Sequence, residues 1–174
     1  MNKLFSLIPL LFVLTGLPAQ AQVRSEPAKD QDDLLYSADP VLAANKKLAY
    51  DMYREVLEAG QVDRIPHYVR EDYIQHNPNV VTGRAALESF IAGSRPSRKA
   101  DDKIMLPLIS IIAERDLVMF NFVRTEQDAN GETYYTTWFD VFRIEDGLVV
   151  EHWDPALKRA DALKFNPNSQ RLKD

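Results

Sequence analysis

The sequence predicts an α+β domain in which N-terminal helices pack on one face of a curved antiparallel sheet. Two observations lead to this fold class. Apolar residues recur at helical spacing up to about residue 92, whereas from Lys103 onward the period becomes two and β-branched and aromatic residues dominate. Short turn signals separate the later segments, and turns this short force neighbouring strands to be antiparallel. Helices followed by a meander of strands make an α+β architecture.

The first 21 residues have the features of a signal peptide. Lys3 gives a basic start, residues 4–17 form an apolar run, and Ala19-Gln20-Ala21 is a small-x-small cleavage site. The apolar run is shorter than the roughly 20 residues that a spanning helix needs. We therefore expect cleavage before Gln22, a periplasmic or secreted protein, and no membrane attachment after cleavage.

Composition narrows the classes of partner and of chemistry. The net charge is −5 and the basic residues are scattered along the chain, so nucleic acid is not an expected partner. The sequence contains no cysteine, which excludes disulfides, zinc–thiolate sites and a cysteine nucleophile. We expect no metal and no cofactor.

The helices are expected in the first half of the domain, which we place at residues 39–165. Residues 22–38 are polar and predict a flexible linker, and residues 166–174 form a tail. Asp39 predicts the cap of a first long helix that ends at Gly60. A short helix is expected at 64–69, an irregular stretch at 73–78, and a third helix at 83–92 capped by Thr82.

The strands are expected after residue 103. Alternating apolar residues predict them at 104–113, 117–127, 132–144 and 148–155.

The last predicted hairpin holds the most informative side chains. A three-residue loop, Glu145-Asp146-Gly147, would pair Asp140 with His152, Phe142 with Val150, and Trp138 with Asp154, all on one face. An apolar bed with a few convergent polar groups predicts a small-molecule pocket. A two-residue turn would instead put Asp140 and His152 on opposite faces. The alternative is that these two residues form an exposed cross-strand pair and that Asp154 only ends the strand.

Three motifs in this order resemble a known family. They are Tyr73-Ile74-Gln75-His76-Asn77-Pro78 ahead of Gly83-Arg84, Asp140-Val141-Phe142-Arg143-Ile144-Glu145-Asp146-Gly147, and Glu151-His152-Trp153-Asp154. Together they resemble the SnoaL-like polyketide cyclase family, and especially its branch named for predicted aldol condensation activity, within the nuclear transport factor 2-like superfamily. The resemblance extends over residues 39–163.

The resemblance implies a cone-shaped curved sheet closed by three helices, with a pocket inside and commonly a homodimer formed through the sheet. It also implies a pocket aspartate acting as the base of an aldol ring closure, with a histidine nearby and no cofactor. By position in the last strand, Asp154 best matches the base, and Asp140 matches a polar position one strand back.

These considerations give one set of site residues and two functions. We expect Asp154 as general base with His152, Asp140 and His76 in support, although His76 could equally be a structural loop residue. Substrate-binding residues are expected to be Tyr73, Gln75, Asn77, Trp138, Phe142 and Val150. The predicted function is a cofactor-independent enzyme of aldol, cyclase or isomerase type that acts on a small hydrophobic or carbonyl-containing molecule. The alternative is a non-catalytic periplasmic binder of a small hydrophobic ligand.

The second face of the hairpin carries Phe139, Val141 and Trp153, and we expect it to form a homodimer contact.

Overall fold

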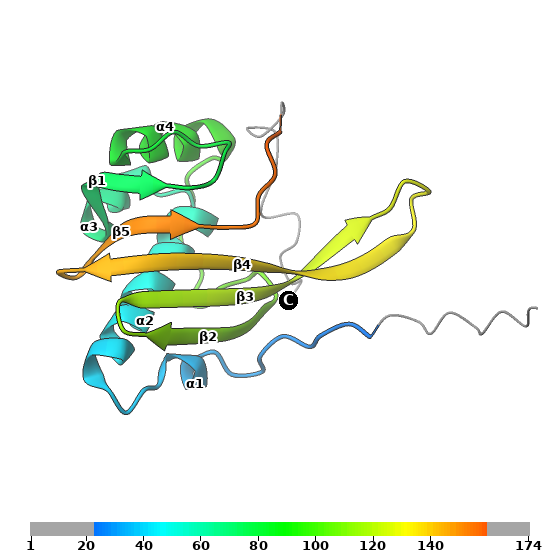
Figure 1. Cartoon of the computed structure of the whole chain (residues 1–174), viewed down its shortest axis with the longest axis horizontal. Helices are drawn as coiled ribbons and strands as arrows, with labels where there is room; N and C mark the ends of the chain where they lie inside the picture. Colours follow the sequence, from blue (N-terminus) through cyan, green and yellow to red (C-terminus); the bar gives the residue numbers. More distant parts are fainter. Residues whose placement is uncertain (1–22, 160–174) are drawn as a thin grey trace, which may run out of the picture.

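Five strands form one sheet in the order β1-β5-β4-β3-β2 (Figure 1). A computed structural model of the chain describes residues 23–159. The strands are β1 (Val69–Gln75), β2 (Leu108–Glu114), β3 (Leu117–Gln127), β4 (Thr133–Glu145) and β5 (Leu148–Trp153). Strands β2 to β5 pair antiparallel, as the short turns predict. The predicted signal peptide and the tail at 166–174 lie outside the described residues.

Strand β1 was not predicted from the sequence. It pairs parallel to β5 at the edge of the sheet, with Gln75 opposite His152. The expected irregular stretch at 73–78 therefore begins as strand. Parallel pairing joins segments far apart in the chain, so no local turn signal announces it.

The helices precede the antiparallel strands, which confirms the α+β class (Figure 1). They are α1 (Asp32–Leu35), α2 (Pro40–Met52), α3 (Ile65–Tyr68) and α4 (Arg84–Ser94). The helix α2 continues as a π-helical segment η1 (Tyr53–Glu58), and a 3₁₀ turn η2 (Val62–Arg64) leads into α3. The Asp39 side chain accepts hydrogen bonds from the backbone N–H groups of Val41 and Leu42, as a helix cap should.

Helix α4, which corresponds to the third predicted helix, is not capped by Thr82 as expected. Gly83 is its N-cap residue and makes no side-chain cap bond. The Thr82 hydroxyl instead accepts a hydrogen bond from the backbone N–H of Gln75, 3.2 Å away. Thr82 therefore joins the end of β1 to the start of α4 and does not cap the helix.

The core lies between the helices and the inner face of the sheet. Side chains from η1, α3 and the strands are completely buried there, among them Val56, Ile65, Phe120 and Val149. The buried Glu58 carboxylate accepts hydrogen bonds from the backbone N–H groups of Met105 and Leu106. It thereby fixes the end of η1 to the segment that leads into β2.

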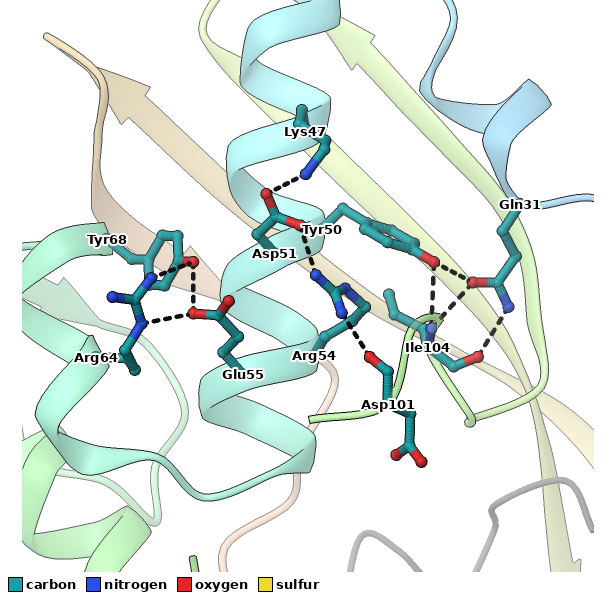
Figure 2. A network of polar contacts seen from close by, with 10 residues as sticks. All are labelled: Gln31, Lys47, Tyr50, Asp51, Arg54, Glu55, Arg64, Tyr68, Asp101 and Ile104. Atoms are coloured by element: carbon teal, nitrogen blue, oxygen red, sulfur yellow. Dashed lines mark hydrogen bonds and ion pairs between the residues drawn. The ribbon is translucent and has the colours of Figure 1, made fainter. Parts of the chain in front are cut away.

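Part of the predicted flexible linker packs on the domain, so that prediction is wrong from Ala28 onward. The Ala28 N–H donates to the Leu108 carbonyl over 2.8 Å. The Gln31 amide donates to the Ile104 carbonyl and accepts from the Tyr50 hydroxyl (Figure 2). Leu34 and Leu35 in α1 also pack against the core, but so short a helix shows no apolar period in the sequence.

Further polar contacts join α2 and η1 to their neighbours (Figure 2). The Glu55 carboxylate accepts hydrogen bonds from Arg64 and from the Tyr68 hydroxyl, which ties η1 to η2 and α3. The Arg54 guanidinium pairs with Asp51 and also donates to the Asp101 carbonyl. These contacts hold the helical layer and the loop before β2 as one unit. No helix among residues 23–159 has the length and apolarity needed to cross a bilayer.

Gly60 ends the helical segment in the left-handed region, at φ 69°, as predicted. A Cβ at this position would lie 2.9 Å from the Arg95 Cγ and 3.0 Å from the Pro96 carbonyl oxygen. Any side chain here would therefore be both strained and too close to its neighbours.

We expect Gly60→Ala to lower the free energy of unfolding by about 2 to 4 kcal/mol, because backbone strain and overpacking add. The matched control is Gly131→Ala, which has φ 82° but open space around the site. It should lower the free energy by about 1 to 2 kcal/mol through strain alone. Urea unfolding of both variants measures the difference, and equal effects would contradict the close approach at Gly60.

Candidate functional site

The turn between β4 and β5 sets where the hairpin side chains point. Asp146 and Gly147 both have positive φ, and Glu145 pairs directly with Leu148. This is a two-residue turn of the type that Asp-Gly favours. The predicted three-residue loop and the pairs derived from it are therefore wrong.

The shorter turn alone would put Asp140 and His152 on opposite faces of the sheet, but a β-bulge in β5 prevents this. Ile144 pairs with Val149 and Arg143 pairs with Glu151, which leaves Val150 as an extra residue in β5. Beyond the bulge, Phe142 pairs with His152. One extra residue shifts the alternation by one, so His152 again shares a face with Asp140.

Asp140 and His152 are buried, at 5% and 7% exposure. The alternative of an exposed cross-strand pair is therefore excluded.

The inner face of the sheet lines a cavity of about 720 Å³. Its walls are mostly apolar and come from η1, α4, the sheet and the segment that follows β5. Eight of the predicted site residues line it: Tyr73, Gln75, Asn77, Trp138, Asp140, Phe142, His152 and Asp154. The polar members gather where β1, β4 and β5 lie side by side.

Hydrogen bonds fix the orientation of the His152 ring and make its Nδ1 a donor. Its Nδ1 lies 2.9 Å from the Gln75 Oε1, which also accepts the backbone N–H of Asn77 over 2.9 Å. A backbone N–H can only donate, so Oε1 is the acceptor for both groups and Nδ1 carries a proton. The other ring nitrogen, Nε2, lies 3.1 Å from the Asp140 Oδ1.

Asp140 accepts hydrogen bonds from several donors at once. The Tyr53 hydroxyl donates to Oδ2 over 2.9 Å, and the Trp138 Nε1 donates to Oδ1 over 3.1 Å. Together with the His152 ring, these donors occupy both oxygens of the buried carboxylate. Burial, followed by the charge of Asp140, raises the pKa of Tyr53 well above its ordinary value, so this hydroxyl stays protonated and donates.

Asp154 and Tyr73 are the polar groups of the cluster with capacity left for a ligand. The Asp154 carboxylate accepts from the Asn77 side chain over 2.7 Å and from the Ala156 N–H over 2.9 Å. Each carboxylate oxygen keeps a second lone pair. The Tyr73 hydroxyl accepts from the Gln75 amide over 2.9 Å, and its own proton has no acceptor among residues 23–159.

Burial, then the charges of Asp154 and Asp140, raises the pKa of Tyr73. The hydroxyl therefore keeps its proton at neutral pH and can donate it in a hydrogen bond to a ligand in the cavity.

Residues 50–152 match the family model of the SnoaL-like domain. The chain belongs to the SnoaL-like family. Its helices lie on one face of a mostly antiparallel five-stranded sheet. No curated protein matches the sequence.

Solved structures similar to this SnoaL-like domain include two described as polyketide cyclases. One is a putative polyketide cyclase from Acidithiobacillus ferrooxidans, with 16% identity over 68% of this chain and 89% of that chain, at a TM-score of 0.48. The other is a putative SnoaL-like polyketide cyclase from Jannaschia sp. CCS1, with 16% identity, 76% and 99% coverage, and a TM-score of 0.48. An epoxide hydrolase from M. tuberculosis is 12% identical, with 66% and 84% coverage and a TM-score of 0.48.

Three residues of the SnoaL-like domain could together contact a metal ion. Asp140, His152 and Asp154 each offer one ligand atom, and these atoms lie within 4.8 Å of one another. Both ring nitrogens of His152 already have protein partners. A metal bound to His152 would have to replace one of these hydrogen bonds.

Two predicted site residues lie elsewhere. The His76 ring is on the outer face, where its Nε2 contacts Glu151 over 2.7 Å and the ring stacks on Trp153. Alternation along the chain explains this, because Gln75 points inward and the next residue therefore points outward. Val150 is buried but does not line the cavity, and Val149 lines it instead. The predictions for His76 and Val150 are therefore wrong.

Tyr53, Arg95 and Arg124 are among the cavity residues that the sequence did not indicate. Tyr53 belongs to the apolar stripe of the first helix, where nothing distinguishes it from a core residue. Arg95 belongs to a charged loop in the sequence, and Arg124 lies in a predicted strand, where one charged residue does not by itself indicate a cavity wall. Arg124 stacks over the Trp138 ring at 4.3 Å and pairs with Glu126.

We expect Tyr53→Phe to lower the free energy of unfolding by about 1 to 3 kcal/mol, because it removes a buried hydrogen bond to a charged group. Tyr36→Phe is the control, since Tyr36 is 76% exposed. It should change the free energy by less than about 0.5 kcal/mol. Urea unfolding compares the two, and a Tyr53→Phe protein as stable as the control would contradict the assigned network.

Proposed function

We propose that this SnoaL-like domain is an exported, cofactor-independent enzyme that removes a proton next to a carbonyl group. The substrate class is a small carbonyl or polyketide-like molecule, and the reaction is of aldol, cyclase or isomerase type. One observation carries the proposal: a carboxylate and a protonated phenol with free hydrogen-bonding capacity meet at the polar end of a largely apolar cavity.

In this proposal, Asp154 is the general base. Its contacts with Asn77 and the Ala156 N–H hold the carboxylate at the cavity wall. A free lone pair then accepts the proton from the carbon next to the substrate carbonyl. Half-burial of Asp154 in an apolar cavity limits competition from water for that lone pair.

Tyr73 serves the other half of the reaction. Removing the proton places negative charge on the carbonyl oxygen, and a fixed donor aimed at that oxygen stabilises the enolate. The raised pKa keeps the Tyr73 proton in place as that donor. The Gln75 amide donates to the same hydroxyl oxygen and so directs the O–H away from itself, toward the cavity.

Asp140 and His152 act as positioning residues. Their hydrogen bond holds the imidazole, and His152 in turn holds the Gln75 amide that orients Tyr73. Because both ring nitrogens are occupied, His152 has no free atom for proton transfer in this arrangement. The base is therefore assigned to Asp154.

A non-catalytic binder is the second candidate. It is favoured by the saturation of Asp140 and His152, whose polar side-chain atoms all have protein partners. Buried polar networks of this kind also occur as purely structural elements. In this case the apolar walls, including Phe142 and Trp138, would determine affinity.

Asp154→Asn separates the two candidates. A ligand is first found by thermal shift on the purified protein with a set of small carbonyl compounds, and its chemical change is followed by mass spectrometry. We expect the variant to bind such a ligand with unchanged affinity and to lose turnover by at least about 100-fold, as removal of a general base does.

Glu151→Gln is the matched control, because it also changes an acid to its amide, three residues earlier in β5, but on the outer face. It should retain full turnover. If both the wild type and Asp154→Asn bind a ligand and neither converts it, the protein is a binder and the enzyme proposal is wrong.

We also propose that two copies associate through the outer face of the hairpin. Phe139, Val141 and Trp153 are half-buried, and alternation along the strands places them on the face opposite the cavity-lining Asp140 and Phe142. Apolar and aromatic side chains of this kind are enriched at the centres of subunit interfaces.

We expect a dimer in sedimentation velocity at micromolar concentration, and a monomer for Val141→Glu because a charge would be placed in the interface. Val81→Glu is the control, since Val81 is 75% exposed and lies in the loop before α4. It should leave the dimer intact. A wild-type protein that sediments only as a monomer would refute the proposed interface.

A further inference from the structure

Arg95 is a cavity-lining cation that the proposed chemistry does not use. It follows α4 directly and contributes to the cavity wall. Its Nε donates to the Ser94 hydroxyl over 3.1 Å, and its Nη1 donates to the Leu57 carbonyl. Both partners are neutral. Among residues 23–159, no carboxylate forms an ion pair with Arg95.

The charge of Glu58 stabilises Arg95 through space, but Glu58 makes no ion pair with it, because the Glu58 oxygens accept the backbone N–H groups of Met105 and Leu106. Burial lowers the pKa of Arg95, although a guanidinium remains charged at neutral pH. The protein therefore keeps a positive charge at the cavity wall without a carboxylate bonded to the guanidinium.

A structural role explains only part of this arrangement. Hydrogen bonds to Leu57 and Ser94 anchor the ends of η1 and α4, as basic residues near helix ends often do. They use Nε and Nη1 and leave the Nη2 donors without a partner. A desolvated cation is costly unless it is paired, and a planar guanidinium matches a carboxylate in shape and charge.

Arg95 and the polar cluster line the same cavity. The charge of Arg95 acts on the Tyr53 hydroxyl, which donates its hydrogen bond to Asp140. Apolar side chains also line this cavity, including Leu57, Leu87 and Ile91. A ligand in the cavity would therefore meet the polar cluster, the cation of Arg95 and apolar walls.

We infer that the cavity takes an organic acid, with an apolar body and a carboxylate that pairs with Arg95. This inference rests on the proposed function, because it assumes that the same cavity receives a small molecule whose carbonyl lies near Asp154. It narrows the substrate class from any carbonyl compound to carbonyl compounds that also carry an acid group.

The test compares decanoate with methyl decanoate, which have the same apolar body with and without the charge. Calorimetry on the purified wild-type protein should show decanoate binding at least about 10-fold more tightly, as expected for a hydrogen bond to a charged group. Arg95→Gln should weaken decanoate binding by about 10- to 100-fold and leave the ester unchanged. Arg95→Lys, which keeps the charge, should retain part of the preference.

Lys99→Gln is the matched control, because it removes the same charge from an exposed neighbour outside the cavity wall. It should change neither affinity. Lys158→Gln combined with Arg159→Gln tests the two cations of the segment after β5, which also line the cavity. If this pair abolishes the preference for the acid while Arg95→Gln does not, the assignment to Arg95 is wrong.

The outcomes distinguish this inference from the proposed function. Equal affinity of the wild type for acid and ester, or no binding of either, overturns the inference and leaves the Asp154→Asn test of the enzyme proposal unaffected. A preference that depends on Arg95, in a protein that converts no carbonyl compound, supports the inference and overturns the enzyme. If Arg95→Gln does not fold, the inference is tested by the affinities of the wild type for decanoate and methyl decanoate and by the same comparison on Arg95→Lys.

Discussion

The site depends on one extra residue in β5. Val150 occupies a bulge between Val149 and Glu151, and every side chain after it changes face as a result. Without the bulge, the two-residue turn would direct His152 to the outer face and leave Asp140 buried without its histidine. The bulge is thus the constraint that brings the imidazole into the cavity. It also explains why Val149 lines the cavity and Val150 does not.

From His152, a continuous set of hydrogen bonds connects the elements around the cavity. It runs from Tyr53 in η1 through Asp140 in β4 to His152 in β5, and then through Gln75 to Tyr73 in β1. Each polar atom that this chain buries has a partner, which is the condition under which a buried network stabilises one arrangement of side chains. The same chain leaves free capacity at the groups facing the cavity. Asp140 and His152 therefore serve stability, since their polar atoms are all bonded, whereas the Tyr73 proton and the nearby Asp154 carboxylate keep capacity for a ligand.

Much of the fold could be predicted because its signals are local. Asp39 and Gly60 mark the ends of the first helical segment, and alternation in β3 and β4 fixes which residues point inward. Strand β1 could not be predicted, since its partner lies over 70 residues away and only the fold brings them together. The hairpin shows a further limit. The predicted register was wrong, yet the predicted face of His152 was correct. The shorter turn alone would move His152 to the other face, and the extra residue Val150 moves it back. Arg95 gave no signal, since a charged loop residue and a cavity-lining cation look the same in sequence.

The N-terminal segment has a consequence for how copies of this protein can meet. Strand β2 is one edge of the sheet, and an uncovered edge is a template for adding a strand from another molecule. The Ala28 N–H donates a hydrogen bond to the Leu108 carbonyl at the start of that edge, and α1 packs against the same strand. At the opposite edge, β1 is interrupted by a register shift and contacts α4. Because both edges of the sheet are obstructed, the addition of a strand from another molecule is disfavoured, and the proposed contact between copies uses the outer face of the sheet instead.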